Sequence, residues 1–539
     1  MRLEIELIDG GGAGLSPDLP PVRIKPRRRR RIDGFEFGVL AVFAAVSAWV
    51  LAIDLWRVVF DGAVWTGTDG VYIVDQMQYL AWIRDASHHV LVSNLFVLRS
   101  TPTDYFQPAV VISGALTAVG ISPSLSLLLW KPVAVLALFF GVRAYGRRSV
   151  TGLWSRRAVL VLALFFGSYT YFYGNWSVLG DLFPGFLTWG YVFGVMALAA
   201  MVWALVAHDD ARGGGRRWWL AGLLGALASL LHPWNGELLI FLVLSAEAVM
   251  LVLRRYGRQH LKLTAATLIG TGVPLLYYAI LGKADMNWKL AQIASRHSFP
   301  FSAILIAVLP LLLPALVAYR TRPATFLAAV TRTWPAAAFG IFLLSGTSLG
   351  ATPLHAFQGI TLPLAVLAVE GLQLLGWRRL RHPVLAGAVL VALFTIPTTI
   401  DELKISHALA APTAENANFI RRDENTALDY LAKNKDPGSV LTRSYLGSVV
   451  PGRTGRHTYI GDCLWSEPAC MSLTYNAQWL FDGAPSGNPT PAAARSFVLS
   501  SGVRFLLADC ETTTDIPKLL GPVIQSTQSF GCATVYEVE

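Results

Sequence analysis

Residues 299–319 read FPFSAILIAVLPLLLPALVAY, a run that contains no charged side chain. A helix needs about 20 consecutive apolar residues to cross a bilayer, so this run predicts a transmembrane helix. Ten more runs of the same character, some of them shorter, lie before residue 400. The eleven candidate spans are 36–54, 122–145, 157–175, 183–206, 218–231, 234–253, 262–281, 299–319, 333–348, 357–376 and 383–399.

The composition of the whole chain agrees with these spans. Of its 539 residues, 54% are hydrophobic and 14% are charged, and the mean hydropathy is +0.49. A water-soluble protein carries roughly 25% charged residues. We therefore expect a polytopic α-helical membrane protein with about 11 transmembrane helices and the lipid bilayer as its surroundings.

The net charge of +10 is concentrated in short gaps between the apolar runs. Lys and Arg beside membrane spans mark the cytoplasmic side, so this basicity indicates topology and not a nucleic-acid partner. An odd number of spans then leaves the N-terminus in the cytoplasm and the C-terminal end on the extracytoplasmic side of the plasma membrane. The basic clusters are Arg27–Arg31 and the pairs at 147–148, 156–157, 216–217, 254–255, 320/322 and 378–379.

The chain divides into three parts on the same evidence. Residues 1–34 read as a flexible, basic cytoplasmic tail, residues 35–400 as the transmembrane domain, and residues 401–539 as a soluble domain. In the last part, helical and strand patterns alternate, which predicts a small α/β domain. We expect helices near 424–433 and 472–481, and strands near 440–443, 457–460, 503–509 and 533–538.

All four cysteines lie in this C-terminal domain. An even number of cysteines confined to one soluble domain is typical of disulfides in an oxidising compartment. We expect bonds between Cys463 and Cys470 and between Cys510 and Cys532. The alternative is four buried free thiols in a cytosolic domain.

The first extracytoplasmic loop, 55–107, is long and rich in apolar and aromatic residues. Within it, residues 74–84 read VDQMQYLAWIR, and Asp75, Tyr79 and Trp82 stand at i, i+4 and i+7 on one helical face. We expect this helix, anchored by Leu80, Trp82 and Ile83, and a second one at 90–98 to lie in the membrane interface. Asp75 and Gln78 also have the spacing of a capping box, in which the acid only satisfies backbone amides.

The pattern D-Q-x-x-Y-x-x-W-I-R at 75–84, the long first loop and the odd number of spans resemble the C-type (GT-C) glycosyltransferases, which include aminoarabinose transferases and protein O-mannosyltransferases. The stretch VLTRSYLGSVVPGRTGRHTYIGD at 440–462 resembles the soluble domain of bacterial members. The resemblance implies a polyprenyl-phosphate sugar donor and a cell-envelope glycan, lipid or protein acceptor at the outer face of the plasma membrane. It also implies that Asp75 is the general base, with Gln76 where the family usually has Glu.

Further polar residues stand at predicted extracytoplasmic positions. The family's Lys-Pro pair is missing from TPTDYFQPAV at 101–110, so we expect Arg84 or Lys289 to bind the donor phosphate. Asp54 suits either the same cavity as Asp75 or a simple span boundary, and His232 and Glu237 suit either the lining of the active cavity or an ordinary turn. The substrate-binding candidates are Gln76, Tyr79, Arg84, Asp54, His232, Glu237 and Lys289.

Other polar residues carry weaker signals. Asp69 lies in a Gly-Thr-Asp-Gly sequence typical of a turn, Asp181 and His355 stand at predicted external ends, and Glu370 is expected to pair with a local base. The run Gly452–Arg456 suits an anion contact or a solvated turn.

The sequence assigns no cofactor, and a divalent metal is left open. Asp85, His88 and His89 are few ligands for a metal site, and a solvated helix end explains them as well. The alternative function is a multi-span transporter or lipid flippase. That class usually shows an internal repeat and acids in mid-span, whereas here the acids gather at predicted external ends.

Overall fold

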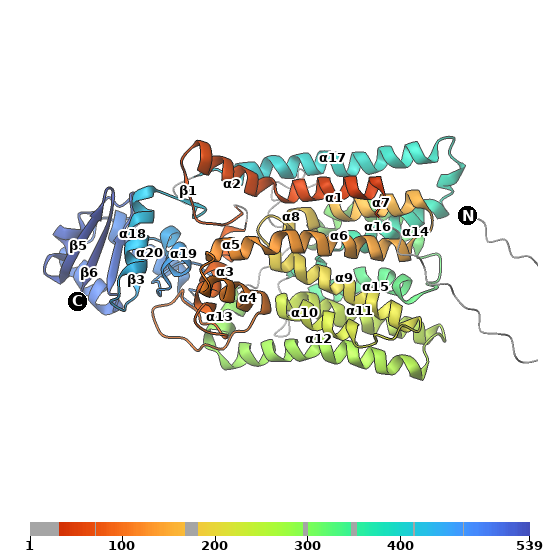
Figure 1. Cartoon of the computed structure of the whole chain (residues 1–539), viewed down its shortest axis with the longest axis horizontal. Coiled ribbons are helices and arrows are strands. Elements are labelled where there is room, and N and C mark those ends of the chain that lie inside the picture. The colour runs from red at the N-terminus through yellow and green to blue at the C-terminus, as the bar shows by residue number, and fades with distance from the viewer. Residues whose placement is uncertain are drawn as a thin grey trace, which may run out of the picture.

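The computed structural model describes residues 32–69, 72–167, 182–294, 300–345, 353–412, 416–466 and 468–539. Long helices run side by side to form a bundle, and a domain that contains a β-sheet lies beyond one end of it (Figure 1). Four shorter helices, α3, α4, α5 and α13, lie between the bundle and that domain. Their bounds are Ile73–Ala86, Pro108–Ala118, Pro123–Leu128 and Met286–Ala294.

Each of the eleven expected apolar runs contains a helix. Within the described residues, seven helices are long and apolar enough to cross a membrane, or eight if α1 and α2, bent by 48°, form one span. The expectation of a polytopic helical membrane protein is confirmed. The helices of the bundle are α1 Gly34–Ser47, α2 Trp49–Phe60, α6 Trp130–Ser149, α7 Leu153–Phe165, α9 Val192–Arg212, α10 Leu220–Leu231, α11 Pro233–Val252, α12 Arg258–Ala284, α14 Phe301–Ala318, α15 Phe326–Leu344, α16 Thr361–Leu374 and α17 Pro383–Leu409.

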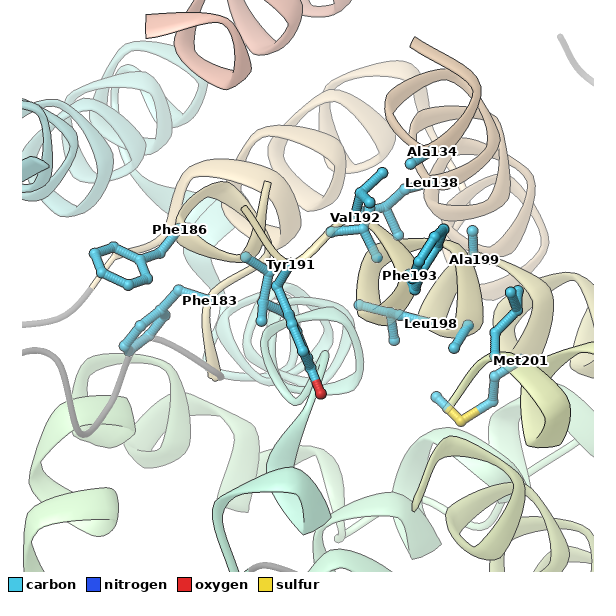
Figure 2. Packing of buried hydrophobic residues seen from close by; sticks show 14 of the residues in the cluster. Ala134, Leu138, Phe183, Phe186, Tyr191, Val192, Phe193, Leu198, Ala199 and Met201 are labelled. Atoms are coloured by element: carbon cyan, nitrogen blue, oxygen red, sulfur yellow. The ribbon is translucent and has the colours of Figure 1, made fainter. Parts of the chain in front are cut away.

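Helix α9 forms the centre of the bundle. In its apolar window 78% of the residues are buried, compared with 22% for α12 and 11% for α17. Figure 2 shows Val192, Phe193 and Leu198 of α9 beside Ala134 and Leu138 of α6. The outer helices α12 and α17 therefore present most of their apolar surface to lipid.

Ion pairs join the helices at the end of the bundle that carries the arginine clusters. Glu36 of α1 pairs with Arg143 of α6 at 3.0 Å, and Glu247 of α11 accepts from Arg212 of α9 at 3.1 Å. Glu370 pairs with Arg332, the local base that the sequence analysis expected. These partners offset the cost of holding charged groups near the membrane.

The first loop contains the expected helix, α3, but in different surroundings. Leu80, Trp82 and Ile83, expected to anchor it in the membrane interface, are 4%, 5% and 0% exposed because they pack inside the protein. The second interfacial helix is also a wrong prediction. Residues 90–98, all of them described, are irregular, and Val92 forms a β-bridge with Tyr105 instead.

The C-terminal part begins after α17, which continues past residue 400 to Leu409. Its four-stranded sheet has the order β3-β4-β6-β5, with β3 parallel to β4 and the other pairs antiparallel. The expected strand at 457–460 is reduced to a bridge between Thr458 and Val440. The elements are β2 Phe419–Ile420, α18 Arg422–Lys433, β3 Val440–Leu441, α19 Ser444–Thr454, α20 Cys470–Asp482, α21 Pro491–Ser501, β4 Phe505–Ala508, α22 Ile516–Leu520, β5 Ile524–Phe530 and β6 Ala533–Val538.

Two disulfides close loops in this domain. Cys463 is bonded to Cys470, and Cys510 is bonded to Cys532, with Cα–Cα distances of 5.1 and 4.8 Å. This is the pairing expected from the sequence.

The C-terminal domain is held against the first loop by hydrogen bonds from backbone amides and from one side chain. Strand β1, Val64–Trp65, pairs antiparallel with β2, with Val64 opposite Ile420. The Thr458 amide donates to the carbonyl of Leu95 at 3.0 Å. The Asn94 side chain donates to the carbonyl of Trp465 at 2.9 Å. The first loop and the domain therefore form one continuous body around α3.

Candidate functional site

Asp75 lies in the first turn of α3. The helix begins at Ile73 with Tyr72 as N-cap, so Asp75 is the third residue of the helix and not its cap. The capping-box interpretation of Asp75 and Gln78 is therefore wrong. A carboxylate in the first turn is still stabilised by the positive end of the helix dipole. Its side chain is half-buried, between the bundle and the C-terminal domain.

Gln76 fixes the start of α3. Its Oε1 accepts a hydrogen bond from the Asp69 amide at 2.7 Å, and its Nε2 donates to the Tyr72 carbonyl at 3.1 Å. The side chain is 2% exposed, so its amide holds the backbone beside Asp75. The structure thus gives Gln76 a positioning role, where the sequence predicted a substrate contact.

Asp69 forms a buried ion pair with Lys131 in the first turn of α6. The two residues are 4% and 8% exposed. The sequence analysis assigned Asp69 to a turn and overlooked Lys131. Lys131 could have been singled out from the sequence, because a lysine at the start of an apolar helix needs a partner for its charge.

Asp54 is completely buried in the middle of α2, where it bonds to the linker that leads to the C-terminal domain. Its Oδ1 accepts from Asn418 Nδ2 at 2.9 Å. The amide oxygen of the same side chain, Asn418 Oδ1, accepts hydrogen bonds from the Thr68 hydroxyl and from Trp65 Nε1. Asp54 therefore holds the linker before β2 against α2.

Tyr79 and Trp82 continue the face of α3 that begins at Asp75. The Tyr79 ring lies 4.7 Å from Phe193 of α9, and the Trp82 ring lies 4.4 Å from Tyr105 and 5.2 Å from Trp465. Both side chains are less than a tenth exposed. This face of the helix therefore joins the bundle to the C-terminal domain through aromatic contacts.

A second carboxyl group approaches Asp75 from the C-terminal domain. Asp462 is 3% exposed, and its Oδ1 accepts from the Leu464 amide at 2.8 Å. Burial, together with the neighbouring Asp75 carboxylate, raises the pKa of Asp462 to about 8. Asp462 is therefore mostly protonated at neutral pH, which relieves the repulsion between the two acids. The sequence analysis did not single it out.

Three buried polar atoms on this side of α3 make no hydrogen bond to any described residue. They are Oδ2 of Asp462, Nε1 of Trp465 and Nε2 of Gln78. Gln78 stands one turn after Asp75 on α3, and Trp465 follows Asp462 by three residues. A hydroxyl-rich ligand or ordered water would satisfy such groups.

His232 and His355 gather beside Tyr191 at the start of α9. The centroids of the two imidazole rings lie 4.7 Å apart, and the Tyr191 ring lies 5.5 Å from His232 and 5.7 Å from Tyr72. His232, at the α10–α11 junction, is 6% exposed, and its Nδ1 is 2.8 Å from Asn235 Oδ1. Tyr191 and Tyr72 therefore connect this histidine pair to the start of α3.

The remaining candidates lie elsewhere. Arg84 lines a cavity of 360 Å³ with Asp429 and Arg453 of the C-terminal domain, while Lys289 is exposed on α13. Glu237 is half-buried in the first turns of α11. Asp181 lies outside the described residues.

Two weaker sequence signals have structural roles. The Asp85 carboxylate accepts from the amide and the hydroxyl of Ser93, which fixes the loop after α3. Arg453 donates to Asn425 and Asp429, and Arg456 donates to four backbone carbonyls, so the run 452–456 holds its own domain together.

Among the described residues, one group of three side chains lies close enough together to hold a metal ion. It consists of Asp423, Cys510 and Cys532. Its two cysteines are bonded to each other, so the group offers no thiolate ligands.

Comparisons with known proteins identify the fold. No protein-family model matches the sequence, and no curated protein matches it. Among solved structures, the oligosaccharyltransferase AglB of Archaeoglobus fulgidus, tethered with an acceptor peptide, matches with a TM-score of 0.53 and 14% identity over 88% of this chain and 69% of its own. The arabinofuranosyltransferase AftD of mycobacteria matches with a TM-score of 0.54 and 14% identity.

ArnT of Cupriavidus metallidurans bound to undecaprenyl phosphate matches with a TM-score of 0.51 and 15% identity, over 93% of this chain and 98% of that one. The match to AftD covers 93% of this chain and 40% of AftD. All three are glycosyltransferases of the GT-C class. The chain therefore shares the fold of these glycosyltransferases, and the resemblance noted from its first loop is confirmed at the level of the fold.

Proposed function

We propose that this protein is a membrane glycosyltransferase that moves a sugar from a polyprenyl-phosphate donor to a hydroxyl group of a cell-envelope acceptor. The observation that carries the proposal is Asp75, an acid in the first turn of a helix enclosed by the bundle and the C-terminal domain of a GT-C fold. ArnT in its complex binds undecaprenyl phosphate, and AglB has been solved with dolichol-phosphate. A lipid phosphate is therefore the donor chemistry that this fold supports.

In the proposed reaction, Asp75 acts as general base. The acceptor hydroxyl gives its proton to the Asp75 carboxylate while its oxygen forms a bond to the anomeric carbon of the sugar. The bond between that carbon and the phosphate oxygen breaks, and the electron pair leaves with the polyprenyl phosphate. Because the pKa of Asp462 is raised to about 8, a protonated Asp462 adds no second negative charge beside Asp75 at neutral pH.

The reaction is proposed to take place on the extracytoplasmic side. The arginine clusters favour a cytoplasmic N-terminus, and eleven spans would then carry the C-terminal domain across the membrane. Its two disulfides support an oxidising compartment. The substrates of the proposed site would accordingly be a lipid-borne sugar and a component of the cell envelope.

The test is transfer from a set of polyprenyl-phosphate sugars by purified wild type and Asp75→Asn. Loss of the base is expected to reduce transfer by about 10²- to 10⁴-fold. Asp61→Asn is the matched control, because Asp61 is an exposed acid of the same loop whose ion pair with Arg57 is worth little. Transfer by Asp75→Asn at the rate of Asp61→Asn would disprove the role of Asp75.

A further inference from the structure

A groove of 340 Å³ lies between α2 and the last turns of α17. It is lined by Trp49, Ile400, Leu403, Lys404 and His407. The Trp49 indole donates to the Leu403 carbonyl at 3.1 Å and so joins the two helices. The groove therefore combines an apolar floor with two basic side chains.

The position of the groove along α17 matches the edge of a bilayer. A helix rises about 1.5 Å per residue, so Lys404 stands about 31 Å beyond Pro383, which is close to the thickness of the hydrocarbon core, about 30 Å. Between them, exposed apolar side chains recur at three- or four-residue spacing on one face of α17. They are Leu385, Val389, Leu393, Ile396 and Ile400, each 47% to 63% exposed.

The two basic side chains of the groove form no ion pair within the described part of the chain. Lys404 and His407 are exposed, and neither forms an ion pair or a side-chain hydrogen bond with another described residue. The nearby Glu402 is 9% exposed and faces the bundle, where a Cβ on Gly167 would approach its Oε1 to 2.5 Å. The groove therefore offers its charge to the membrane surface.

We infer that this groove binds the headgroup phosphate of an anionic phospholipid, with Lys404 and His407 on the phosphate and an acyl chain along the apolar face of α17. Phosphate is the anion that the headgroup layer supplies at this depth, and basic side chains at that level attract anionic lipids. Lysines near helix ends also extend into this layer without binding a particular lipid. A preference for anionic headgroups separates the two cases.

A lipid bound here would brace the attachment of the C-terminal domain. Helix α2 leads into β1 and helix α17 leads toward β2, and these two strands pair with each other. Asp54, one turn beyond Trp49 on α2, accepts from Asn418 next to β2. The lipid would thus hold together the two helices from which the first loop and the domain emerge.

The inference is tested on the purified full chain with phosphatidylglycerol and phosphatidylcholine of identical acyl chains. Native mass spectrometry counts retained lipids, and thermal unfolding measures the stabilisation. Wild type is expected to retain phosphatidylglycerol in preference, and K404E combined with H407A to bind it about ten-fold or more weakly. K283E is the matched control, because Lys283 is exposed in the last turn of the other outer helix, α12.

Equal retention of the two lipids by wild type, or equal retention of phosphatidylglycerol by wild type and the double variant, would overturn the inference. Undecaprenyl phosphate is added as a third ligand. If wild type retains undecaprenyl phosphate in preference to phosphatidylglycerol, and the double variant loses that preference, the groove belongs to the donor lipid and the phospholipid assignment is wrong. None of these measurements requires glycosyl transfer, so they stand or fall separately from the proposed function.

Discussion

Asp75 and Asp462 come from opposite sides of the contact between α3 and the C-terminal domain. Because the pKa of Asp462 is raised to about 8, its carboxyl keeps a proton in the folded chain that it loses above about pH 4 in the unfolded chain. Its contribution to stability is therefore complete below about pH 4 and is lost as the pH rises through about 8. Replacement by Asn removes this dependence.

We expect the melting temperature of the wild type to fall more than that of Asp462→Asn between about pH 6 and about pH 9. Thermal unfolding in detergent across this range measures the difference. Asp61→Asn should follow the wild type, because Asp61 is exposed on the surface of the first loop. Parallel curves for wild type and Asp462→Asn would show that the Asp462 carboxyl is ionised throughout.

At the scale of single residues, the sequence points to residues that belong to a recognisable pattern with their neighbours along the chain. Asp75 was singled out because its neighbours form a recognisable pattern, and its role stays a prediction. Glu370 was expected to pair with a local base, which is Arg332. Asp462 and Lys131 were missed because their partners, Asp75 and Asp69, lie far away along the chain. Gln76 was predicted to contact the substrate. Its hydrogen bond from the Asp69 amide could not be predicted, because it depends on how the chain turns between residues 69 and 76.

At the scale of elements, α3 was predictable and its surroundings were not. Helical spacing placed the helix correctly, since period depends only on local geometry. The apolar residues of α3 could pack either against lipid or inside the protein. In the structure they pack inside the protein, because the C-terminal domain lies against α3. Residues 90–98 were predicted to be helical but are irregular, because Val92 pairs with Tyr105 and Asn94 bonds to Trp465.

The β1–β2 pair depends on Asn418, which is completely buried. Its replacement by Ala leaves the Asp54 carboxylate and the Thr68 hydroxyl without their partner, at a cost of about 1–3 kcal/mol for each buried group. We expect Asn418→Ala to lower the melting temperature and to speed the release of the C-terminal domain by protease. Asn488→Ala, at an exposed position in the same domain, should change neither. An Asn418→Ala protein as resistant to protease as the wild type would rule out this role of β1–β2.

At the scale of the whole molecule, the sequence predicted the membrane class from apolar runs that need no tertiary information. The attachment of the C-terminal domain was beyond reach, because it depends on short pairings such as Val64 with Ile420 and Thr458 with Leu95. These pairings enclose α3 and bring Asp462 to Asp75. The proposed site therefore exists only in the assembled chain, and its orientation in the membrane decides which substrates reach it.

That orientation is measurable by cysteine labelling in intact cells. Lys435→Cys, exposed in the C-terminal domain, is expected to react with a membrane-impermeant maleimide, whereas Arg320→Cys, exposed after α14 among the basic gaps, should react only after lysis. The four native cysteines are paired in disulfides, so the wild type should remain unlabelled without a reductant. If Arg320→Cys reacts in intact cells and Lys435→Cys does not, the topology is inverted. Asp75 would then face the cytoplasm, away from any extracytoplasmic acceptor.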